Sequence, residues 1–244
     1  MIMTGKVNQF RHELKYLINE PEMAAIMARL RGFMTLDPNA SEDGYMIRSL
    51  YFDDVWNSAY EEKYMGIYAR RKYRIRIYNC SDKGIKLERK KKEGNYIFKE
   101  SASLTRAETE AILDGEYDFL LEKDNKLLKE FYYECVSNFL RPRTIVDYDR
   151  IPFIMDEGTV RVTFDRDVRA AVLSYDIFDP ELPTMGVLDS GYLVMEVKYT
   201  EFLPQLIRDL LPPKSREMVA VSKYVLCCDK TQYLFNESYY GGSV

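Results

Sequence analysis

Charged and apolar residues alternate one by one in several short segments of this chain. In residues 72–78, Lys72, Arg74 and Arg76 alternate with aromatic and aliphatic residues. Successive side chains of a β-strand point to opposite faces, so these three cations share one face of an extended strand. The same alternation, usually with charges of both signs on one face, recurs in residues 10–17, 86–90, 159–165 and 193–199. The chain therefore contains several strands with one apolar and one charged face.

The wider pattern of strands and helices indicates the fold class. Strand-like segments are expected at residues 10–17, 45–52, 69–79, 84–92, 96–99, 144–153, 159–165 and 191–199. Helices are expected at residues 21–34, 105–115, 122–139, 204–211 and 217–228, and Thr105 with Glu108 forms a capping box. Eight strands is the number that closes a small barrel. We therefore predict an α+β fold, an eight-stranded antiparallel β-barrel tunnel with helices packed outside.

Nothing in the sequence divides the chain into parts. There is no Pro/Gly/Ser-rich linker, low-complexity tract or internal repeat, and 46% of the 244 residues are hydrophobic. A chain of this length and composition buries a sizeable core in one unit. We therefore expect a single domain over residues 1–244.

The charged strand faces have two interpretations. The first is an ordinary antiparallel sheet with one solvated face and one face covered by helices. However, Lys and Arg dominate these faces, and eight strands can close with the charges pointing inward. Unpaired buried cations each cost several kcal/mol, so such an interior needs water and a polyanion. This second interpretation predicts a phosphate-binding channel.

The distribution of charge supports a local anion site. The net charge is −4, which argues against a general nucleic-acid-binding protein. Residues 69–100 nevertheless contain twelve Lys or Arg against four acidic residues. A basic segment in an otherwise acidic chain is typical of a local anion site rather than a broad electrostatic surface.

Several other classes are excluded by missing features. The chain has no apolar run of membrane-spanning length and no secretory signal, so we expect a cytoplasmic protein. The four cysteines lack metal-ligand spacing and His12 is the only histidine, which argues against a zinc site. No P-loop is present, so recognition of ATP would have to centre on its triphosphate.

Eight short segments, in order along the chain, point to a known family. They are residues 13–16, 48–53, 72–76, 87–90, 148–150, 160–165, 195–199 and 222–224. Together they resemble the VTC catalytic domain, the polyphosphate-polymerising member of the CYTH or triphosphate tunnel metalloenzyme superfamily. The resemblance implies an eight-stranded tunnel whose basic wall binds a polyphosphate chain, with ATP or triphosphate as substrate and a divalent metal, Mn²⁺ or Mg²⁺, as cofactor.

The resemblance also implies site residues. Catalytic positions are assigned to Arg74, Arg76, Lys90, Arg150 and Arg161. Substrate-binding positions are assigned to Lys15, Lys99, Lys198 and Lys223. Glu196 is the expected metal ligand, and Glu13 and Glu88 either assist it or orient nearby cations. Superfamily members often have Glu-x-Glu-x-Lys in the first strand, but Arg11 replaces the first glutamate here, which favours the polymerase branch.

Residues beside these motifs are expected to have other functions. We expect a solvated position for Arg70, Arg71, Lys91 and Lys92, although Lys92 is in phase with Lys90 and falls near the tunnel opening. Asp53 and Asp165 are expected to be structural or to lie behind the ligands. His12 is expected outside the barrel, and Trp56, the only tryptophan, is expected to anchor a short helix.

Three functions remain open from the sequence. The first is polyphosphate synthesis, in which the terminal phosphate of a growing chain attacks the γ-phosphorus of ATP. The second is hydrolysis of triphosphate or nucleoside triphosphate in the same tunnel, with water as the nucleophile. The third is a polyphosphate-binding module without catalysis. The sequence contains neither an SPX domain nor membrane helices, so a membrane protein that accepts the product would be a separate partner.

Overall fold

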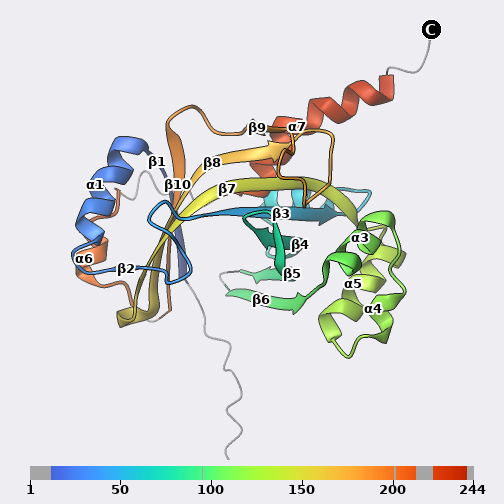
Figure 1. The fold of residues 1–244 in the computed structure, drawn as a ribbon, viewed down its shortest axis with the longest axis horizontal. Coiled ribbons are helices and arrows are strands. Elements are labelled where there is room, and N and C mark those ends of the chain that lie inside the picture. Colours follow the sequence, from blue (N-terminus) through green and yellow to red (C-terminus); the bar gives the residue numbers. More distant parts are fainter. Residues whose placement is uncertain (1–11, 95, 201, 213–221, 241–244) are drawn as a thin grey trace, which may run out of the picture.

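The computed structural model describes residues 12–94, 96–200, 202–212 and 222–240. Predictions that concern Arg11 and residues 217–221 lie outside the described residues. One antiparallel sheet of ten strands forms the body of the molecule (Figure 1). Its main path, in spatial order, is β1 (His12–Asn19), β10 (Tyr192–Tyr199), β8 (Val160–Ala171), β7 (Arg141–Met155), β3 (Tyr45–Asp53), β4 (Ala69–Tyr78), β5 (Ser81–Glu93) and β6 (Tyr96–Ser103). The short strands β2 (Thr35–Leu36) and β9 (Thr184–Gly186) pair with β7 and β8.

All eight expected strands are present, but the sheet does not close into a barrel. β1 and β6 are the two ends of the path, and no ladder joins them within the described residues. Closure depends on strand tilt and on the shear of the register, which a count of strands does not determine. The sheet still curls enough for side chains to meet across the gap, since Lys90 Nζ on β5 lies 3.3 Å from Glu13 Oε2 on β1. The predicted α+β fold with a large antiparallel sheet is therefore confirmed, whereas the eight strands do not close into a barrel: within the described residues the sheet is curled and open.

Seven α-helices accompany the sheet in the described residues, and most lie outside its curl (Figure 1), whereas Lys223 and Tyr224 at the start of the last helix face its interior. They are α1 (Glu20–Leu30), α2 (Ser58–Tyr64), α3 (Arg106–Asp114), α4 (Phe119–Glu122), α5 (Lys126–Ser137), α6 (Gln205–Arg208) and α7 (Lys223–Tyr240), with a 3₁₀ turn, η1 (Glu157–Thr159). The expected capping box begins α3, where the Glu108 N–H donates to Thr105 Oγ1 at 3.2 Å and the Thr105 N–H donates to Glu108 Oε2 at 2.8 Å. None of the helices in the described part of the chain is long and apolar enough to span a membrane.

Two helix predictions need correction. The helix expected over residues 122–139 begins only at Lys126, as α5, because Lys123 is extended and Asn125 caps the helix by accepting from Leu127 and Leu128; Glu122 instead ends the separate short helix α4. Trp56 was expected to anchor a short helix, but its side chain is 81% exposed. Buried Asp53 performs that function, since its carboxylate accepts hydrogen bonds from the N–H groups of Ala59 and Tyr60 in the first turn of α2.

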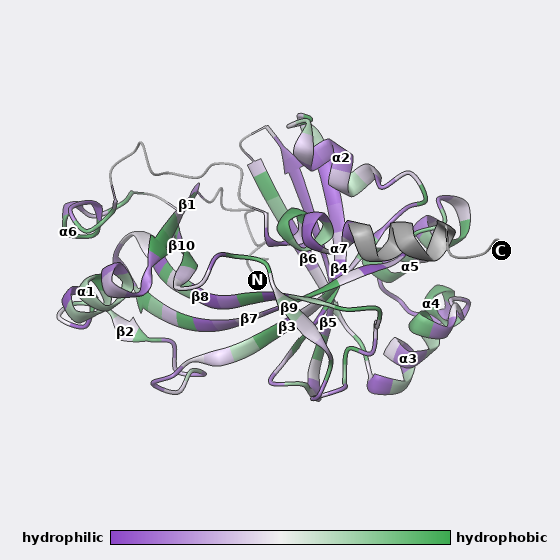
Figure 2. Ribbon diagram, turned by 90° about the horizontal axis from the view of Figure 1, so that it is seen from above, coloured by the Kyte–Doolittle hydropathy of each residue, from purple (hydrophilic) through white to green (hydrophobic). Residues whose placement is uncertain are grey.

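Two hydrophobic clusters use the apolar faces of the strands. One packs β3, β4 and β5 against α3, α4 and α5, and it includes the fully buried Ile75, Leu87 and Phe131. The other packs β1, β10, β8 and β7 against α1 and α6, with Phe164 and Met195 at its centre. The alternation of hydrophobic and hydrophilic residues is visible along β7 and β8 in Figure 2. Since the helices cover the apolar faces, the charged faces turn toward the inside of the curl.

A buried ion pair joins the middle strands. Arg48 on β3 and Asp147 on β7 are cross-strand partners, and Arg48 Nη2 lies 2.9 Å from Asp147 Oδ2. Arg48 Nη1 also donates to the backbone carbonyls of Ile177 and Asp179, which ties the segment after β8 to the sheet. Both partners of the pair are almost fully buried. This contact fixes the register of β3 against β7, the strand that also carries Arg150.

Candidate functional site

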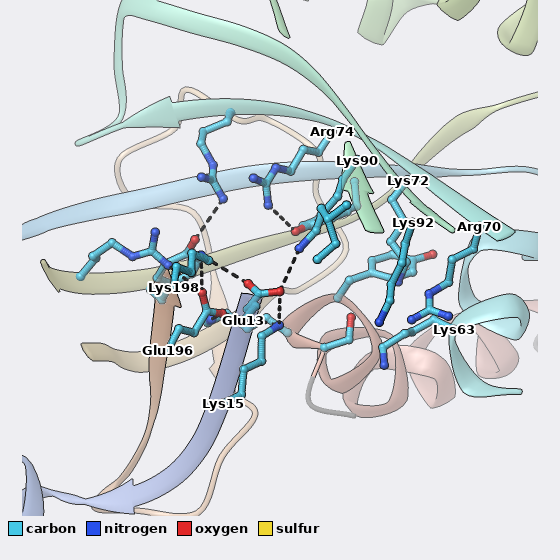
Figure 3. Close-up of a pocket in the computed structure, with 18 of the residues that line it drawn as sticks. Glu13, Lys15, Lys63, Arg70, Lys72, Arg74, Lys90, Lys92, Glu196 and Lys198 are labelled. Carbon is cyan, nitrogen blue, oxygen red and sulfur yellow. Dashed lines mark hydrogen bonds and ion pairs between the residues drawn. The ribbon is translucent and has the colours of Figure 1, made fainter. Parts of the chain in front are cut away.

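The charged strand faces surround a cavity of about 340 Å³ (Figure 3). Among the described residues, it is lined by eleven lysine and arginine side chains and two carboxylates, Glu13 and Glu196. The cations are Lys15, Lys63, Arg70, Lys72, Arg74, Arg76, Lys90, Lys92, Arg150, Lys198 and Lys223. They come from strands β1, β4, β5, β7 and β10 and from helices α2 and α7. Seven separate elements thus direct cations into one space.

Strand β4 supplies a row of cations to the cavity. Arg70, Lys72, Arg74 and Arg76 occupy alternate positions of this strand, as the period-two pattern predicts. At a rise of about 3.3 Å per residue, the row extends over about 20 Å. A linear arrangement of this kind matches an extended anion better than a compact one.

The last two arginines of this row, Arg74 and Arg76, are held in fixed orientations. Arg74 Nε donates to Glu88 Oε2 at 2.7 Å, and Arg74 Nη1 donates to the Tyr51 hydroxyl at 2.8 Å. Arg76 donates to the Ser49 hydroxyl at 3.1 Å and to the Tyr148 hydroxyl at 3.0 Å. Burial disfavours the charged form of Arg74, but Tyr51 and Glu88 raise its pKa, so it stays cationic. The two guanidinium groups are therefore positioned before any ligand binds.

The two carboxylates lie on neighbouring strands. Glu13 on β1 is the cross-strand partner of Lys198 on β10, and Lys198 Nζ lies 3.4 Å from Glu13 Oε1 and 2.8 Å from Glu196 Oε2. Lys223 donates to Glu196 Oε1 at 2.9 Å. Burial alone would raise both pKa values, but the surrounding lysines lower the pKa of Glu13 to about 2 and hold that of Glu196 well below its ordinary value. Both groups are thus ionised at neutral pH.

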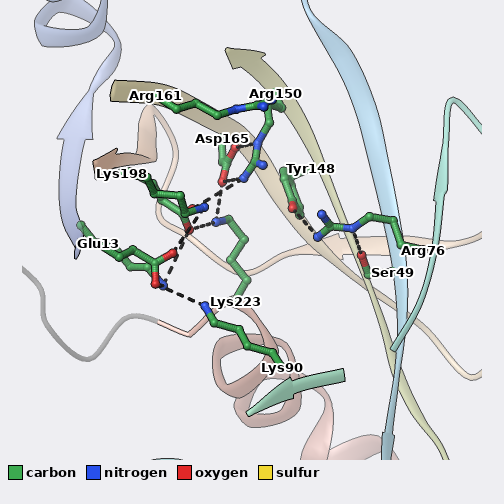
Figure 4. A network of polar contacts seen from close by, with 12 residues as sticks. Glu13, Ser49, Arg76, Lys90, Tyr148, Arg150, Arg161, Asp165, Lys198 and Lys223 are labelled. Carbon is green, nitrogen blue, oxygen red and sulfur yellow. Dashed lines mark hydrogen bonds and ion pairs between the residues drawn. The ribbon is translucent and has the colours of Figure 1, made fainter. Parts of the chain in front are cut away.

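A third carboxylate, Asp165, lies behind the cavity wall and positions two cations (Figure 4). Its two oxygens accept from Arg150 Nε at 2.6 Å and Nη2 at 2.8 Å. Lys223 Nζ lies 2.5 Å from Asp165 Oδ2 and 4.9 Å from the centroid of the Tyr148 ring. Burial opposes ionisation of Asp165, but Arg150 and Lys223 lower its pKa. Asp165 therefore has the structural function expected from the sequence.

Four further cations of the cavity have no carboxylate within ion-pair distance among the described residues. Lys63, Arg70, Lys72 and Lys92 form no ion pair with any described residue, and we call these four the outer cation cluster. Lys72 Nζ is buried, has no hydrogen-bond partner among the described residues and lies 4.2 Å from the centroid of the Tyr224 ring. Burial lowers the pKa of Lys72 to about 7, and it also lowers the pKa values of Lys63 and Lys92.

Most of the sequence-predicted site residues meet in this cavity. Nine of them line it, namely Lys15, Arg74, Arg76, Lys90, Arg150, Lys198, Lys223, Glu13 and Glu196. Three do not line it: Arg161, Lys99 and Glu88. Arg161 pairs with Asp37 at 2.9 Å, while Lys99 and Arg74 both bind Glu88. The assigned functions of all these residues stay predictions.

Other residues of the cavity were missed or misplaced by sequence reasoning. Arg70 and Lys92 were expected to be solvated, but they are cross-strand partners on the cation-bearing face of β4 and β5. The phase of Arg70 with Lys72 was the signal that could have found it, and the phase of Lys92 with Lys90, noted from the sequence, agrees with the place of Lys92. His12 was expected outside, yet it lines the cavity and stacks on the Tyr199 ring at 4.8 Å. Lys63 comes from α2, and no local pattern indicates it.

The two lining carboxylates fit a divalent metal only in part. No group of three or more His, Cys, Asp or Glu side chains with metal-binding geometry occurs in the described residues. Mg²⁺ and Mn²⁺ usually take one or two protein carboxylates and complete their coordination with water and substrate phosphates. Glu13 and Glu196 match such a partial set. Glu88 fits less well, because it faces Arg74 and Lys99 instead of the cavity.

Comparisons with known proteins agree with this geometry. The VTC domain model matches residues 10–232. A putative adenylyl cyclase from Hippeastrum, described as having a dominant triphosphatase activity, is 11% identical, with a TM-score of 0.53 over 91% of this chain and 96% of that chain. A putative adenylate cyclase from Vibrio parahaemolyticus is also 11% identical, with a TM-score of 0.51 over 90% of this chain and 99% of that chain. At such identities these two likenesses show a common fold. The search of curated proteins finds no match.

Proposed function

Because this chain belongs to the VTC domain family, we propose that it is a metal-dependent polyphosphate polymerase that transfers the γ-phosphate of ATP to a growing polyphosphate chain. One observation carries the proposal: a cavity lined by eleven cations and two ionised carboxylates. The cations exceed the negative charges that a single orthophosphate supplies. A triphosphate or longer chain matches this surface. The sheet that builds the cavity runs through the described residues from β1 to β10, which supports a single domain.

The fixed arginines suit phosphoryl transfer. This reaction asks a protein mainly to position the phosphates and to neutralise charge on the transferring oxygens. Arginine binds phosphate oxygens through a planar fork and does not lose its proton. Arg74 and Arg76 are already oriented by Glu88 and by three hydroxyl groups, so they lose little freedom when phosphate binds.

Glu196, with Glu13 beside it, would hold the divalent metal. When bound, the metal would supply charge neutralisation at the phosphate oxygens. Lys198 and Lys223 now satisfy Glu196, and their ammonium groups are the nearest donors to move onto phosphate when the carboxylate takes another cation. The lysines therefore act as an internal counter-ion of the free protein and as phosphate ligands of the complex.

The assignment of both lining carboxylates to the metal favours chain extension over hydrolysis. Water needs a general base, and a useful base has a pKa near the working pH. Glu13 and Glu196, the two carboxylates that line the cavity, would both be held by the metal, so neither would be free to take a proton from water. The terminal phosphate of a polyphosphate chain is already anionic and needs no such base. Hydrolysis, the activity described for the Hippeastrum protein, remains the second candidate because both reactions would use the same cations.

The decisive experiment follows the products of ATP. Purified protein is incubated with ATP and Mn²⁺, and the products are resolved on a gel. The proposal predicts a ladder of polyphosphate. Orthophosphate alone would support the triphosphatase, and unchanged ATP with tight polyphosphate binding would support a binding module.

Three variants test the site itself. Loss of a group that stabilises the developing charge typically costs about 10²–10³ in kcat, so R74Q and E196Q are expected to lose turnover by at least that factor. Arg71 is the neighbouring arginine of β4, its side chain is 51% exposed, and it pairs with Glu134 outside the cavity. R71Q is therefore the matched control and keeps its activity. Full activity of R74Q and E196Q would refute the site.

A further inference from the structure

The loop between α2 and β4 exposes a run of large apolar side chains. Residues 64–68 read Tyr-Met-Gly-Ile-Tyr, carry no charge, and are called here the apolar loop. Single exposed apolar residues are common on protein surfaces, whereas contiguous ones mark a surface that contacts a protein or a membrane. The four large side chains of the loop are all exposed, namely Tyr64 (73%), Met65 (68%), Ile67 (43%) and Tyr68 (71%).

The backbone of the apolar loop is held at both ends. At its start the Met65 N–H donates to the Glu61 carbonyl at 2.8 Å, and at its end the Gly94 N–H donates to the Tyr68 carbonyl at 2.9 Å. Between these contacts Gly66 has a φ of 71°, and a Cβ built there would meet no heavy atom within 4 Å beyond its neighbours in the described chain. The apolar side chains are therefore displayed on a fixed backbone whose tip is open.

Positive charge flanks the apolar loop on both sides. Lys63 directly precedes the loop, and Arg70 follows one residue after its end. Figure 3 shows Lys63 and Arg70 beside each other on one side of the cavity, and neither pairs with a carboxylate among the described residues. The acidic residues Glu61 and Glu62 lie earlier in α2, where Glu62 accepts from the Arg71 N–H. The result is an uncharged apolar tip with a cation at each end.

This arrangement matches the surface of a lipid bilayer. Tyrosine rings favour the headgroup region, aliphatic side chains enter the acyl boundary, and lysine and arginine reach back to the headgroups. Membrane attachment strengthens with buried apolar area and with attraction to anionic lipids, and the loop and its flanking cations supply one each. A stable protein interface buries roughly 800 Å² per partner from about 20–30 residues, far more than a loop of five residues offers. The lipid surface is therefore the better match.

We propose that the apolar loop inserts into the surface of a bilayer that contains anionic phospholipids, with Lys63 and Arg70 near the headgroups. The proposal does not depend on the reaction assigned to the cavity. Since both cations also line the cavity, insertion of the loop places that side of the cavity next to the membrane.

The test measures co-sedimentation of the full chain with vesicles, without ATP. The vesicles contain phosphatidylcholine alone or mixed with phosphatidylserine. M65S/Y68S removes an aliphatic and an aromatic side chain of the loop. F202S/L206S is the matched control, because Phe202 and Leu206 are 54% and 53% exposed beside α6, which lies far from α2 in Figure 2. A third variant, W56F/Y68W, moves the only tryptophan of the chain into the loop, where its fluorescence reports insertion.

The proposal predicts a selective loss of vesicle binding. M65S/Y68S should bind the mixed vesicles at least about tenfold more weakly than the wild type, because two side chains no longer leave water, while F202S/L206S binds as the wild type does. The emission of W56F/Y68W should shift to shorter wavelength with the mixed vesicles and much less with phosphatidylcholine alone.

Three results would overturn the proposal. They are a wild-type protein that does not bind the mixed vesicles, equal binding by M65S/Y68S and the wild type, and an unshifted emission of W56F/Y68W. A wild-type dimer that M65S/Y68S converts to a monomer would assign the loop to a second copy of the chain and would also overturn it. The ladder of products from ATP is measured without vesicles, so the proposed function stands or falls separately.

Discussion

Replacing Lys72 with methionine should make the protein more stable. Methionine keeps the apolar stem and removes an ammonium that is buried, has no described hydrogen-bond partner and lies over the Tyr224 ring. Burial lowers the pKa of Lys72 from 10.5 to about 7. One pKa unit corresponds to about 1.4 kcal/mol, so the charged form costs up to about 5 kcal/mol. The cation–π contact with the Tyr224 ring offsets about 1–2 kcal/mol of the cost of burying the charged ammonium. We therefore expect K72M to raise the free energy of unfolding by about 3–4 kcal/mol near neutral pH.

The gain should depend on pH in a defined direction. Below about pH 7 the ammonium is charged in both the folded and the unfolded state, so the full cost of Lys72 applies. Between about 7 and 10.5 the unfolded state binds more protons than the folded state, so the stability of the wild type rises with pH. The advantage of K72M should therefore be largest at about pH 6 and smaller at about pH 9.

Urea unfolding at the two pH values measures this difference. K91M on the outer face of β5 is the control, and as an exposed substitution it should change stability by about 0.5 kcal/mol or less. K72M should also weaken binding of long-chain polyphosphate, because the substitution that stabilises the fold removes a cation from the lining of the cavity. A K72M protein that is less stable than the wild type at both pH values would refute the reasoning that Lys72 is retained for a ligand.

Three further predictions concern other parts of the chain. D147N leaves the buried Arg48 guanidinium without its carboxylate and should lower the free energy of unfolding by about 3–5 kcal/mol, measured as a lower urea midpoint. An unchanged midpoint would mean that the ion pair does not contribute to stability. Binding of polyphosphate at about pH 8 should be accompanied by uptake of a proton, because a nearby anion raises the pKa of Lys72 from about 7. Calorimetry in buffers of different ionisation enthalpy measures this proton uptake, and binding heats that do not depend on the buffer would contradict the prediction. T105A removes half of the α3 capping box and should lower stability by about 1 kcal/mol in thermal unfolding, while an unaltered Tm would argue against the cap.

Local patterns predicted the strands and the charged faces well. The period-two phase of Lys72, Arg74 and Arg76 placed these residues on one face, and all three line the cavity. The capping box at Thr105 likewise marked the start of α3. Such features depend on neighbouring residues only, and a single sequence contains that information.

Features that depend on distant parts of the chain were missed. Closure of the sheet depends on the relative tilt and register of strands far apart in sequence, so the count of eight strands led to a barrel that does not close. Lys63 reaches the cavity because α2 follows a loop held by Asp53, and no periodicity marks this contact. Trp56 was assigned to packing by residue type alone, although its surroundings leave it exposed. Arg161 had the right strand phase, but Asp37 and Tyr45 bind its guanidinium.

The most direct test of the account is a crystal structure of the protein with Mn²⁺ and a non-hydrolysable ATP analogue. The account predicts phosphate oxygens within hydrogen-bond distance of Arg74 and Arg76, with Mn²⁺ on Glu196 and with Lys198 and Lys223 moved from this carboxylate onto phosphate. Phosphates bound outside the cavity, with Glu196 still held by the two lysines, would contradict it.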